Sequence, residues 1–241
     1  MPLPLLVAIQ FLTTLPVNVR SMPSPQDTGS SINWYGVVGL MLGLILLVSG
    51  YVLDHLFAPM VTAAILLALW VILTGALHLD GLGDCADGLL ADSRTRALEI
   101  MRDPRAGAFS IVAITLVLVV KFAALIVLIE YGEWSVIVAA PILGRVAVQA
   151  LFLTTPYVRE NGLASTLVAH MNRDRVKFAL LVAILFSSLL LWNGVWWVLP
   201  SLVIMFAGIR HLMMKKLLGT TGDSAGALVE IIEVTVLLLA V

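Results

Sequence analysis

Most of this chain consists of long apolar stretches separated by short polar loops. A membrane-spanning helix needs about 20 apolar residues, and seven stretches come close to or meet that length. They cover residues 33–53, 59–79, 109–129, 135–155, 177–193, 195–212 and 225–241. Charged residues make up only 12% of the 241 residues, about half the fraction in a soluble domain. Because so few charges cannot cover a water-soluble surface, the sequence predicts an all-α, polytopic membrane helix bundle.

The first residues form a shorter apolar stretch that differs from the seven candidate spans. Residues 3–17 are apolar but interrupted or flanked by Pro2, Pro4 and Pro16. We expect an interfacial or re-entrant segment there. Residues 177–212 are divided only by the weak turn signal of Trp192, Asn193 and Gly194. We expect one integral-membrane domain over residues 1–241.

The basic residues predict the orientation of the bundle, because cytoplasmic loops carry an excess of Lys and Arg. Basic residues occupy alternate connections, with Arg20 before the first span, then Arg94, Arg96, Arg102 and Arg105, then Arg159, Arg173, Arg175 and Lys177, and finally Arg210, Lys215 and Lys216. The intervening loops contain no Lys or Arg. The basic loops are therefore expected in the cytoplasm and the C-terminus on the opposite side.

Charge and cysteine content exclude some classes of protein. The net charge of −1 gives no basic surface for nucleic acid. The single cysteine, Cys85, excludes an internal disulfide and a zinc site built from cysteines.

An acidic, glycine-rich motif follows the second predicted span and is the main candidate for chemistry. It reads His78-Leu79-Asp80-Gly81-Leu82-Gly83-Asp84-Cys85-Ala86-Asp87-Gly88. On a helix with about 100° per residue, Asp80, Asp84 and Asp87 fall within about 60° of one another. The three carboxylates would repel each other and resist desolvation unless a cation joined them. Oxygen ligands favour Mg²⁺ or Mn²⁺, and Mg²⁺ is commonly held by carboxylates together with substrate phosphates.

The glycines of this motif leave its surface bare, so a bulky diphosphate could approach, although they also weaken the helix. The alternative is an acidic loop that only solvates a membrane boundary. His78 could act as a ligand, a proton carrier or a polar cap, and we include it among the substrate-binding candidates.

A second polar group follows between residues 94 and 107. Arg102 and Arg105 lie three residues apart, and their planar guanidinium groups suit phosphate oxygens. They could clamp an anionic leaving group, while Asp103 could extend the metal site. The alternative is ordinary positive-inside charge with surface ion pairs.

Two cations lie inside predicted spans. Arg145 is about 15 Å of helix away from the end of its span. Such residues are functional candidates, so we assign Lys121 and Arg145 to substrate binding in a polar cavity. The alternative is an internal ion pair that only holds helices together.

The last motif precedes the final span. It reads Gly219-Thr220-Thr221-Gly222-Asp223-Ser224-Ala225-Gly226. Such a turn can cradle phosphate at a helix N-terminus. Asp223 could bind substrate or metal, and ordinary helix capping is the alternative. Glu230 and Glu233 could face the same cavity, and the loop 159–163 is a weaker candidate for substrate contact.

These motifs carry a resemblance to a known family. The acidic motif, followed by Leu98-Glu99-Ile100-Met101-Arg102-Asp103, resembles the signature of the cobalamin synthases, also called adenosylcobinamide-GDP ribazoletransferases. Residues 11–17 (Phe-Leu-Thr-Thr-Leu-Pro-Val) and 221–227 resemble the family's terminal motifs. One departure is the segment 33–36, where the family often has a Phe-Pro pair.

The resemblance implies a reaction and its partners. A ribose hydroxyl of α-ribazole, or of its 5′-phosphate, attacks the corrinoid-side phosphorus of adenosylcobinamide-GDP, and GMP leaves. Mg²⁺ and the bacterial cytoplasmic membrane are implied, and contact with other corrinoid-pathway enzymes is possible. The distribution of basic loops places the active site on the cytoplasmic side. Asp80, Asp84, Asp87 and Asp103 are then metal candidates, Asp84 or Asp87 the general base, and Arg102 and Arg105 the groups that stabilise departing GMP.

Three other classes remain open. CDP-alcohol phosphotransferases begin their motif with Asp-Gly, as Asp80-Gly81 does here, but their following Ala-Arg is missing. Membrane prenyltransferases use two separated Asp-rich motifs, and this chain has one cluster. A cation-coupled transporter would usually show inverted repeats, and no second copy is evident.

Overall fold

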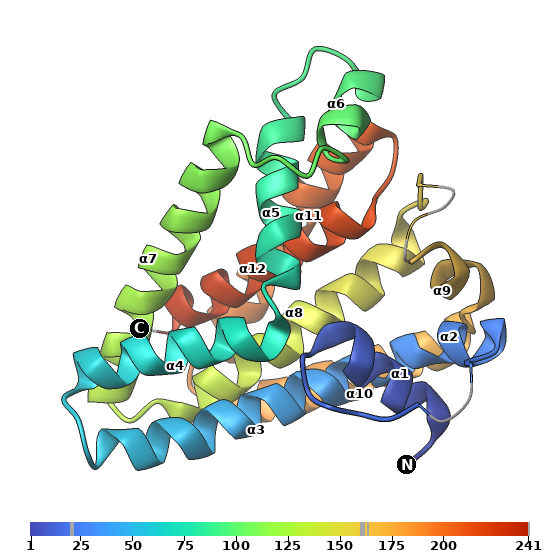
Figure 1. Ribbon diagram of the computed structural model, residues 1–241. Coiled ribbons are helices and arrows are strands. Elements are labelled where there is room, and N and C mark those ends of the chain that lie inside the picture. The colour runs from blue at the N-terminus through green and yellow to red at the C-terminus, as the bar shows by residue number, and fades with distance from the viewer. Residues whose placement is uncertain (20–21, 160–161, 163, 241) are drawn as a thin grey trace.

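The computed structural model describes residues 1–19, 22–159, 162 and 164–240, and Figure 1 shows their arrangement. Arg20, one of the basic residues behind the predicted orientation, and Glu160, Asn161 and Leu163 of the weaker candidate loop lie outside this part of the chain. The helices are α1 (Leu3–Leu12), α2 (Pro25–Ser31), α3 (Tyr35–Asp54), α4 (Pro59–Thr74), α5 (Leu77–Gly88), α6 (Arg94–Ile100), α7 (Ala108–Glu130), α8 (Trp134–Thr154), α9 (Ser165–His170), α10 (Arg173–Leu190), α11 (Val195–Leu217) and α12 (Gly222–Leu239), with a 3₁₀ turn at Ile32–Trp34. No β-strand forms within the described ranges, so the predicted all-α membrane bundle is confirmed.

Helix α8 is the centre of the bundle. It is almost entirely buried, and α3, α10 and α12 pack around it (Figure 1). Gly39 and Gly43 of α3 bring the two backbones into close contact. A Cβ atom at Gly39 would lie 2.5 Å from the Pro141 carbonyl oxygen, and one at Gly43 would lie 2.7 Å from that of Val138. Small residues four apart thus allow the close packing that membrane helices use in place of a hydrophobic driving force.

Fewer helices meet the requirements of a membrane span than the seven predicted. By length and composition, four do so within the described residues: Pro25–Asp54, which contains α3, and α7, α8 and α11. The bent pair α4 and α5 would be a fifth. The predicted spans near 177–193 and 225–241 form α10 and α12, but charged residues at the start of α10 and within α12 make them less apolar. The turn at residues 191–194 separates α10 from α11, as the weak turn signal predicted.

The predicted span 59–79 is wrong in one important respect, because it is not continuous. Helix α4 ends at Thr74, and α5 leaves it at an angle of 86°. Gly75 and Ala76 both adopt left-handed backbone conformations, with φ of 59° and 56°. A left-handed residue commonly ends a helix, so two in succession separate the acidic motif into a helix of its own.

The N-terminal segment docks onto this break. Helix α1 has ten residues, which is about half the length needed to cross a membrane. After it, the Thr14 backbone N–H donates to the Leu73 carbonyl at 2.8 Å, and the Thr14 hydroxyl donates to the Ile72 carbonyl at 2.9 Å. The end of α4 leaves the Leu73 carbonyl without a helical partner, and Thr14 supplies one. The Ile72 carbonyl also accepts the Gly75 backbone N–H, at 3.1 Å.

The basic loops gather at one end of the bundle. There the Arg94 Nε donates to the Leu217 carbonyl at 2.8 Å, and the Arg159 guanidinium pairs with Asp223 at 2.8 Å. At the other end the Trp197 indole N–H donates to the Leu239 carbonyl at 2.9 Å, and Tyr51 packs on Trp134. The alternation of basic and uncharged loops therefore corresponds to two opposite ends of the molecule.

The outward surfaces of the outer helices are apolar. Helices α7 and α11 bury only a minority of their residues, and Leu116 and Ile204 are among the exposed apolar side chains. A soluble protein rarely exposes such continuous apolar surface, so these faces suit contact with lipid tails.

Candidate functional site

The acidic motif forms helix α5, which lies directly against the start of α12. A Cβ atom at Gly81 would lie 2.7 Å from the Asp223 carbonyl oxygen, and one at Gly226 would lie 3.3 Å from the His78 Cα. At Gly81 a side chain would clash with the backbone of α12, and at Gly226 it would make an unusually tight contact. The glycines of the motif therefore have a packing role, and they bring Asp223 next to the aspartates of α5.

Asp80, Asp84 and Asp223 form an acidic cluster with one cation. Asp80 is exposed and Asp84 is half-buried, and the negative charges of Asp80, Asp223 and Asp87 all act on Asp84. Arg159 is the cation, and its guanidinium bonds to the Asp223 carboxylate at 2.8 Å and to the Met101 carbonyl at 3.3 Å. A single arginine leaves the cluster with net negative charge, which favours binding of a further cation.

Asp87 lies on the same helix but is engaged elsewhere. Its carboxylate accepts hydrogen bonds from the backbone N–H groups of Gly107 at 2.7 Å and Ser110 at 3.2 Å, at the N-terminus of α7. A carboxylate at this position satisfies free N–H groups and interacts favourably with the helix dipole. Asp87 thus joins α5 to α7. Of the two general-base candidates, Asp84 and Asp87, it is Asp84 whose carboxylate accepts no such hydrogen bond in the described structure.

The second predicted group lies in the loop between α6 and α7. Arg105 bonds to the Asp103 carboxylate at 2.7 Å, and the Arg105 side chain is 87% exposed. These hydrogen bonds lower the pKa of Asp103 to about 2. Arg102 is also exposed. Within the described residues no hydrogen bond joins these three residues to the aspartates of α5. Their loop nevertheless lies at the rim of the same end of the bundle, because Gly107, two residues after Arg105, donates to Asp87.

A cavity of about 150 Å³ opens beside the acidic cluster. Asp80, Gly222 and Asp223 belong to its polar side. The remaining wall is largely apolar and comes from α1, α3, α5, α8, α12 and the residue before α9. Its apolar members are Phe11, Leu12, Tyr35, Leu77, Val148, Phe152, Ala164, Ala225 and Val229. His78 and Arg145 also line it.

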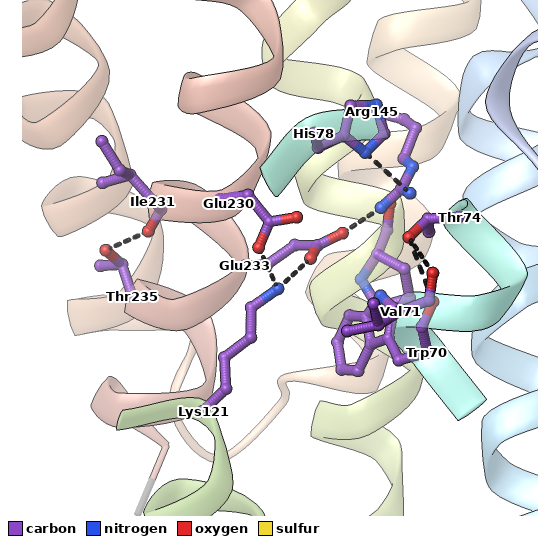
Figure 2. A network of polar contacts seen from close by, with 11 residues as sticks. Trp70, Val71, Thr74, His78, Lys121, Arg145, Glu230, Ile231, Glu233 and Thr235 are labelled. Atoms are coloured by element: carbon purple, nitrogen blue, oxygen red, sulfur yellow. Dashed lines mark hydrogen bonds and ion pairs between the residues drawn. The ribbon is translucent and has the colours of Figure 1, made fainter. Parts of the chain in front are cut away.

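Figure 2 shows a buried ion network, and two of the residues drawn there, His78 and Arg145, also line this cavity. Lys121 Nζ bonds to Glu230 at 2.7 Å and to Glu233 at 2.5 Å, and Arg145 bonds to Glu233. Arg145 also lies 3.4 Å from His78 Nδ1. The ammonium of Lys121 is 4.7 Å from the centre of the Trp70 ring, a cation–π distance.

The ion network shows what surrounds Lys121 and Arg145, the two cations predicted to bind substrate. Two cations and two carboxylates balance, and all four side chains are at most 5% exposed. Lys121 is enclosed by Glu230, Glu233 and Trp70 and does not line the cavity, which corresponds to the internal ion pair that the sequence left open as an alternative. Arg145 combines both arrangements, since it pairs with Glu233 and also lines the cavity.

The donor set is suitable for Mg²⁺ without forming a finished cage. In the described part of the chain, no group of three or more His, Cys, Asp or Glu residues is already arranged to hold a metal ion. Asp80, Asp84 and Asp223 offer oxygen ligands whose charges act on one another, and Arg159 is the one cation among the main charges acting on Asp84 in the described part of the chain. Because Mg²⁺ is usually held by one or two carboxylates plus substrate phosphates and water, these residues fit such an ion.

Some residues of the site had little or no signal in the sequence. Arg159 lies in a loop that the sequence marks only as a weak candidate, yet it bonds to Asp223. Tyr35 and Phe152 line the cavity, and nothing distinguishes them from other apolar residues in their spans. The depth of Arg145 in its span did identify it, because a buried cation needs a partner or a cavity.

Fold and site together define a multi-pass, all-α membrane protein in which two aspartates of an acidic cluster, Asp80 and Asp223, line a largely apolar cavity. The sequence profile of the family described as cobalamin-5-phosphate synthase matches residues 4–241. The chain therefore belongs to this family, as the resemblance of its motifs implied.

Curated relatives agree over nearly the whole chain. A protein of Pseudomonas putida named adenosylcobinamide-GDP ribazoletransferase is 48% identical over 98% of this chain and 97% of its own length. Proteins with the same name from Pseudomonas entomophila and Stutzerimonas stutzeri are 48% and 45% identical, each over 98% of this chain and over 97% and 96% of their own lengths. No solved structure matches the chain.

Proposed function

We propose that this protein transfers the adenosylcobinamide-phosphate group of adenosylcobinamide-GDP to α-ribazole or its 5′-phosphate, with release of GMP. The names of the relatives support this reaction. The observation in the structure that supports it best is the acidic cluster of Asp80, Asp84 and Asp223. Two of its members, Asp80 and Asp223, line a cavity, and Arg159 bonds to Asp223.

Mg²⁺ is part of this proposal. Asp80, Asp84 and Asp223 would hold it, and it would neutralise the diphosphate and the charge that develops in the transition state. Asp103 and Asp87 were also metal candidates. Asp103 is paired with Arg105 in an exposed loop, and Asp87 accepts from the α7 backbone, so the geometry favours the other three.

The side chains of the protein then have distinct tasks. Asp84 accepts the proton of the attacking ribose hydroxyl, since the Asp87 carboxylate is engaged at α7. Arg159 holds the Asp223 carboxylate in place by a charged hydrogen bond of 2.8 Å. Arg102 and Arg105 lie at the rim of this end of the molecule, where they are available to the phosphate of departing GMP.

Release of GMP by the purified protein is the first test. With adenosylcobinamide-GDP and α-ribazole present, we expect GMP to form with Mg²⁺ and not after chelation of divalent cations. Asp84→Asn should abolish turnover and leave the unfolding temperature of the protein close to that of the wild type. Asp92→Asn, a change at an exposed acidic residue of the next loop, is the matched control and should stay active.

Two results would refute parts of this proposal. A wild-type protein that releases no GMP with either acceptor would remove the transferase reaction, and metal-driven uptake into vesicles would then favour the transporter class. An active Asp84→Asn variant would remove Asp84 as the base.

The proposed location is the bacterial cytoplasmic membrane, with the acidic cluster facing the cytoplasm and other corrinoid-pathway enzymes within reach. The gathering of the basic loops at the end with the cluster supports this orientation. Cysteine variants at the exposed positions Asp92 and Glu133 can test it with a membrane-impermeant maleimide. Asp92→Cys should react only in inverted vesicles and Glu133→Cys only in intact spheroplasts, and the opposite pattern would reverse the orientation.

A further inference from the structure

The cavity beside the acidic cluster has two chemically different parts. Asp80 and Asp223 make one part negative and able to bind a cation. The other part is walled by apolar and aromatic side chains such as Phe11, Tyr35 and Phe152. A ligand that fits the whole space therefore has a polar portion at the aspartates and an apolar, preferably aromatic, portion inside.

The positive charge in the inner part is already neutralised. Arg145 forms an ion pair with Glu233, and the whole network of Lys121, Arg145, Glu230 and Glu233 sums to zero. A phosphate placed there would meet no free positive charge and would lie close to buried carboxylates. The inner part therefore suits an uncharged group.

Hydrogen-bond donors remain in this inner part. The Nε–H of Arg145 is buried and has no hydrogen-bond partner within the described chain, although the residue lines the cavity and is 0% exposed. When His78 accepts at Nδ1 from Arg145, its Nε2 carries the proton and is a second donor. An unsatisfied buried donor is costly, so a ligand with an acceptor nitrogen or oxygen would be favoured.

We propose that the inner part of this cavity binds the nitrogen-containing aromatic base of the acceptor, the benzimidazole of α-ribazole. This inference rests on the proposed function and names where its acceptor lies. The ring system fills the apolar walls, its unsubstituted ring nitrogen accepts from Arg145 Nε–H or His78 Nε2–H, and the ribose reaches Asp80 and Asp223. The corrinoid is too large for about 150 Å³, and guanine has several polar groups that an apolar wall leaves unpaired.

Small inhibitors test the chemistry of the cavity with the wild-type protein. Benzimidazole should inhibit GMP release in competition with α-ribazole and not with adenosylcobinamide-GDP. Indole has the same shape but a C–H in place of the acceptor nitrogen, and it should inhibit at least about tenfold more weakly. Equal inhibition by indole, or competition of benzimidazole with the donor substrate, would overturn the proposal.

A variant places that binding in the cavity. Val148 lines the apolar wall, and Val148→Phe should weaken the binding of radiolabelled α-ribazole, measured by equilibrium dialysis without donor substrate, by at least about tenfold. Val112→Phe makes the same change on the exposed face of α7 and should bind like the wild type. Unchanged binding by a folded Val148→Phe protein would overturn the proposal.

The dialysis also separates this inference from the proposed reaction. If wild-type protein binds α-ribazole and Val148→Phe does not, but no GMP is ever released, only the transferase proposal fails. If GMP is released and Val148→Phe binds α-ribazole normally, only the cavity proposal fails.

Discussion

The buried ion network gives the sharpest prediction about stability, because its charge can be counted. Lys121 and Arg145 are balanced by Glu230 and Glu233, and Arg145 has Glu233 as its carboxylate partner in the described structure. Glu233→Gln keeps the shape of the side chain but leaves the network with one excess positive charge. Arg145→Gln leaves one excess negative charge, and the double variant is neutral again.

The expected magnitude follows from burial. The Arg145 side chain is 0% exposed and that of Glu233 1%, and removal of one partner from such a pair costs about 3–5 kcal/mol because the other charge remains buried and unpaired. At 2–4 °C per kcal/mol for a chain of this size, Glu233→Gln should unfold roughly 6–20 °C below the wild type. The double variant should recover about 2 kcal/mol or more of that loss.

Thermal unfolding of the purified protein in detergent measures these differences. Asp174→Asn is the control, because it breaks the pair with Lys177, whose side chains are 62% and 91% exposed, and such pairs contribute less than about 1 kcal/mol. A double variant as unstable as the sum of the two single variants would refute the reasoning, since it would show that charge balance does not stabilise the network.

Two further predictions concern helix α5. Gly81→Ala should destabilise the protein by about 1–3 kcal/mol, because its Cβ would lie 2.7 Å from the Asp223 carbonyl oxygen. The control is Gly208→Ala on α11, where a Cβ meets nothing within 4 Å, and it should stabilise the protein by about 0.5–1 kcal/mol. Shifts of the same sign in the thermal unfolding of the two variants would contradict this. Asp87→Ala should cost about 1–2 kcal/mol and increase hydrogen exchange of the Gly107 and Ser110 amides, whose bonds to Asp87 it removes; unchanged exchange at both amides would exclude the capping role.

The sequence predicted the fold class well but not the path of the chain through it. Apolar length and the scarcity of charges were sufficient for an all-α membrane bundle. The predicted span 59–79 failed because hydropathy continues smoothly across Gly75 and Ala76, while the backbone turns by 86° there. A glycine in an apolar run is compatible with either a helix or a break, so periodicity alone could not choose between them.

The candidate site shows a similar division. Asp80, Asp84 and Asp87 all lie on α5, so the helix that was assumed for their spacing does form. Spacing says nothing about which partners come from distant segments, and Asp87 meets the start of α7 while Asp84 is acted on by Asp223 of α12. Glu230 and Glu233 lie one turn apart, so their shared orientation was predictable, whereas their common partner Lys121 on α7 was not.

The helix break, the N-terminal segment and the cavity are parts of one arrangement. The left-handed turn at Gly75 and Ala76 ends α4, and Thr14 then bonds to the Ile72 and Leu73 carbonyls near that end. This docking fixes the end of α1, where Phe11 and Leu12 contribute to the wall of the cavity. Because α5 starts at the same break, its His78 and Asp80 are positioned relative to that wall. Residues 11–17, which resemble a family motif, thus have a structural role although they carry no ionisable group. Phe11 and Leu12 line the cavity, and Thr14 bonds to the end of α4.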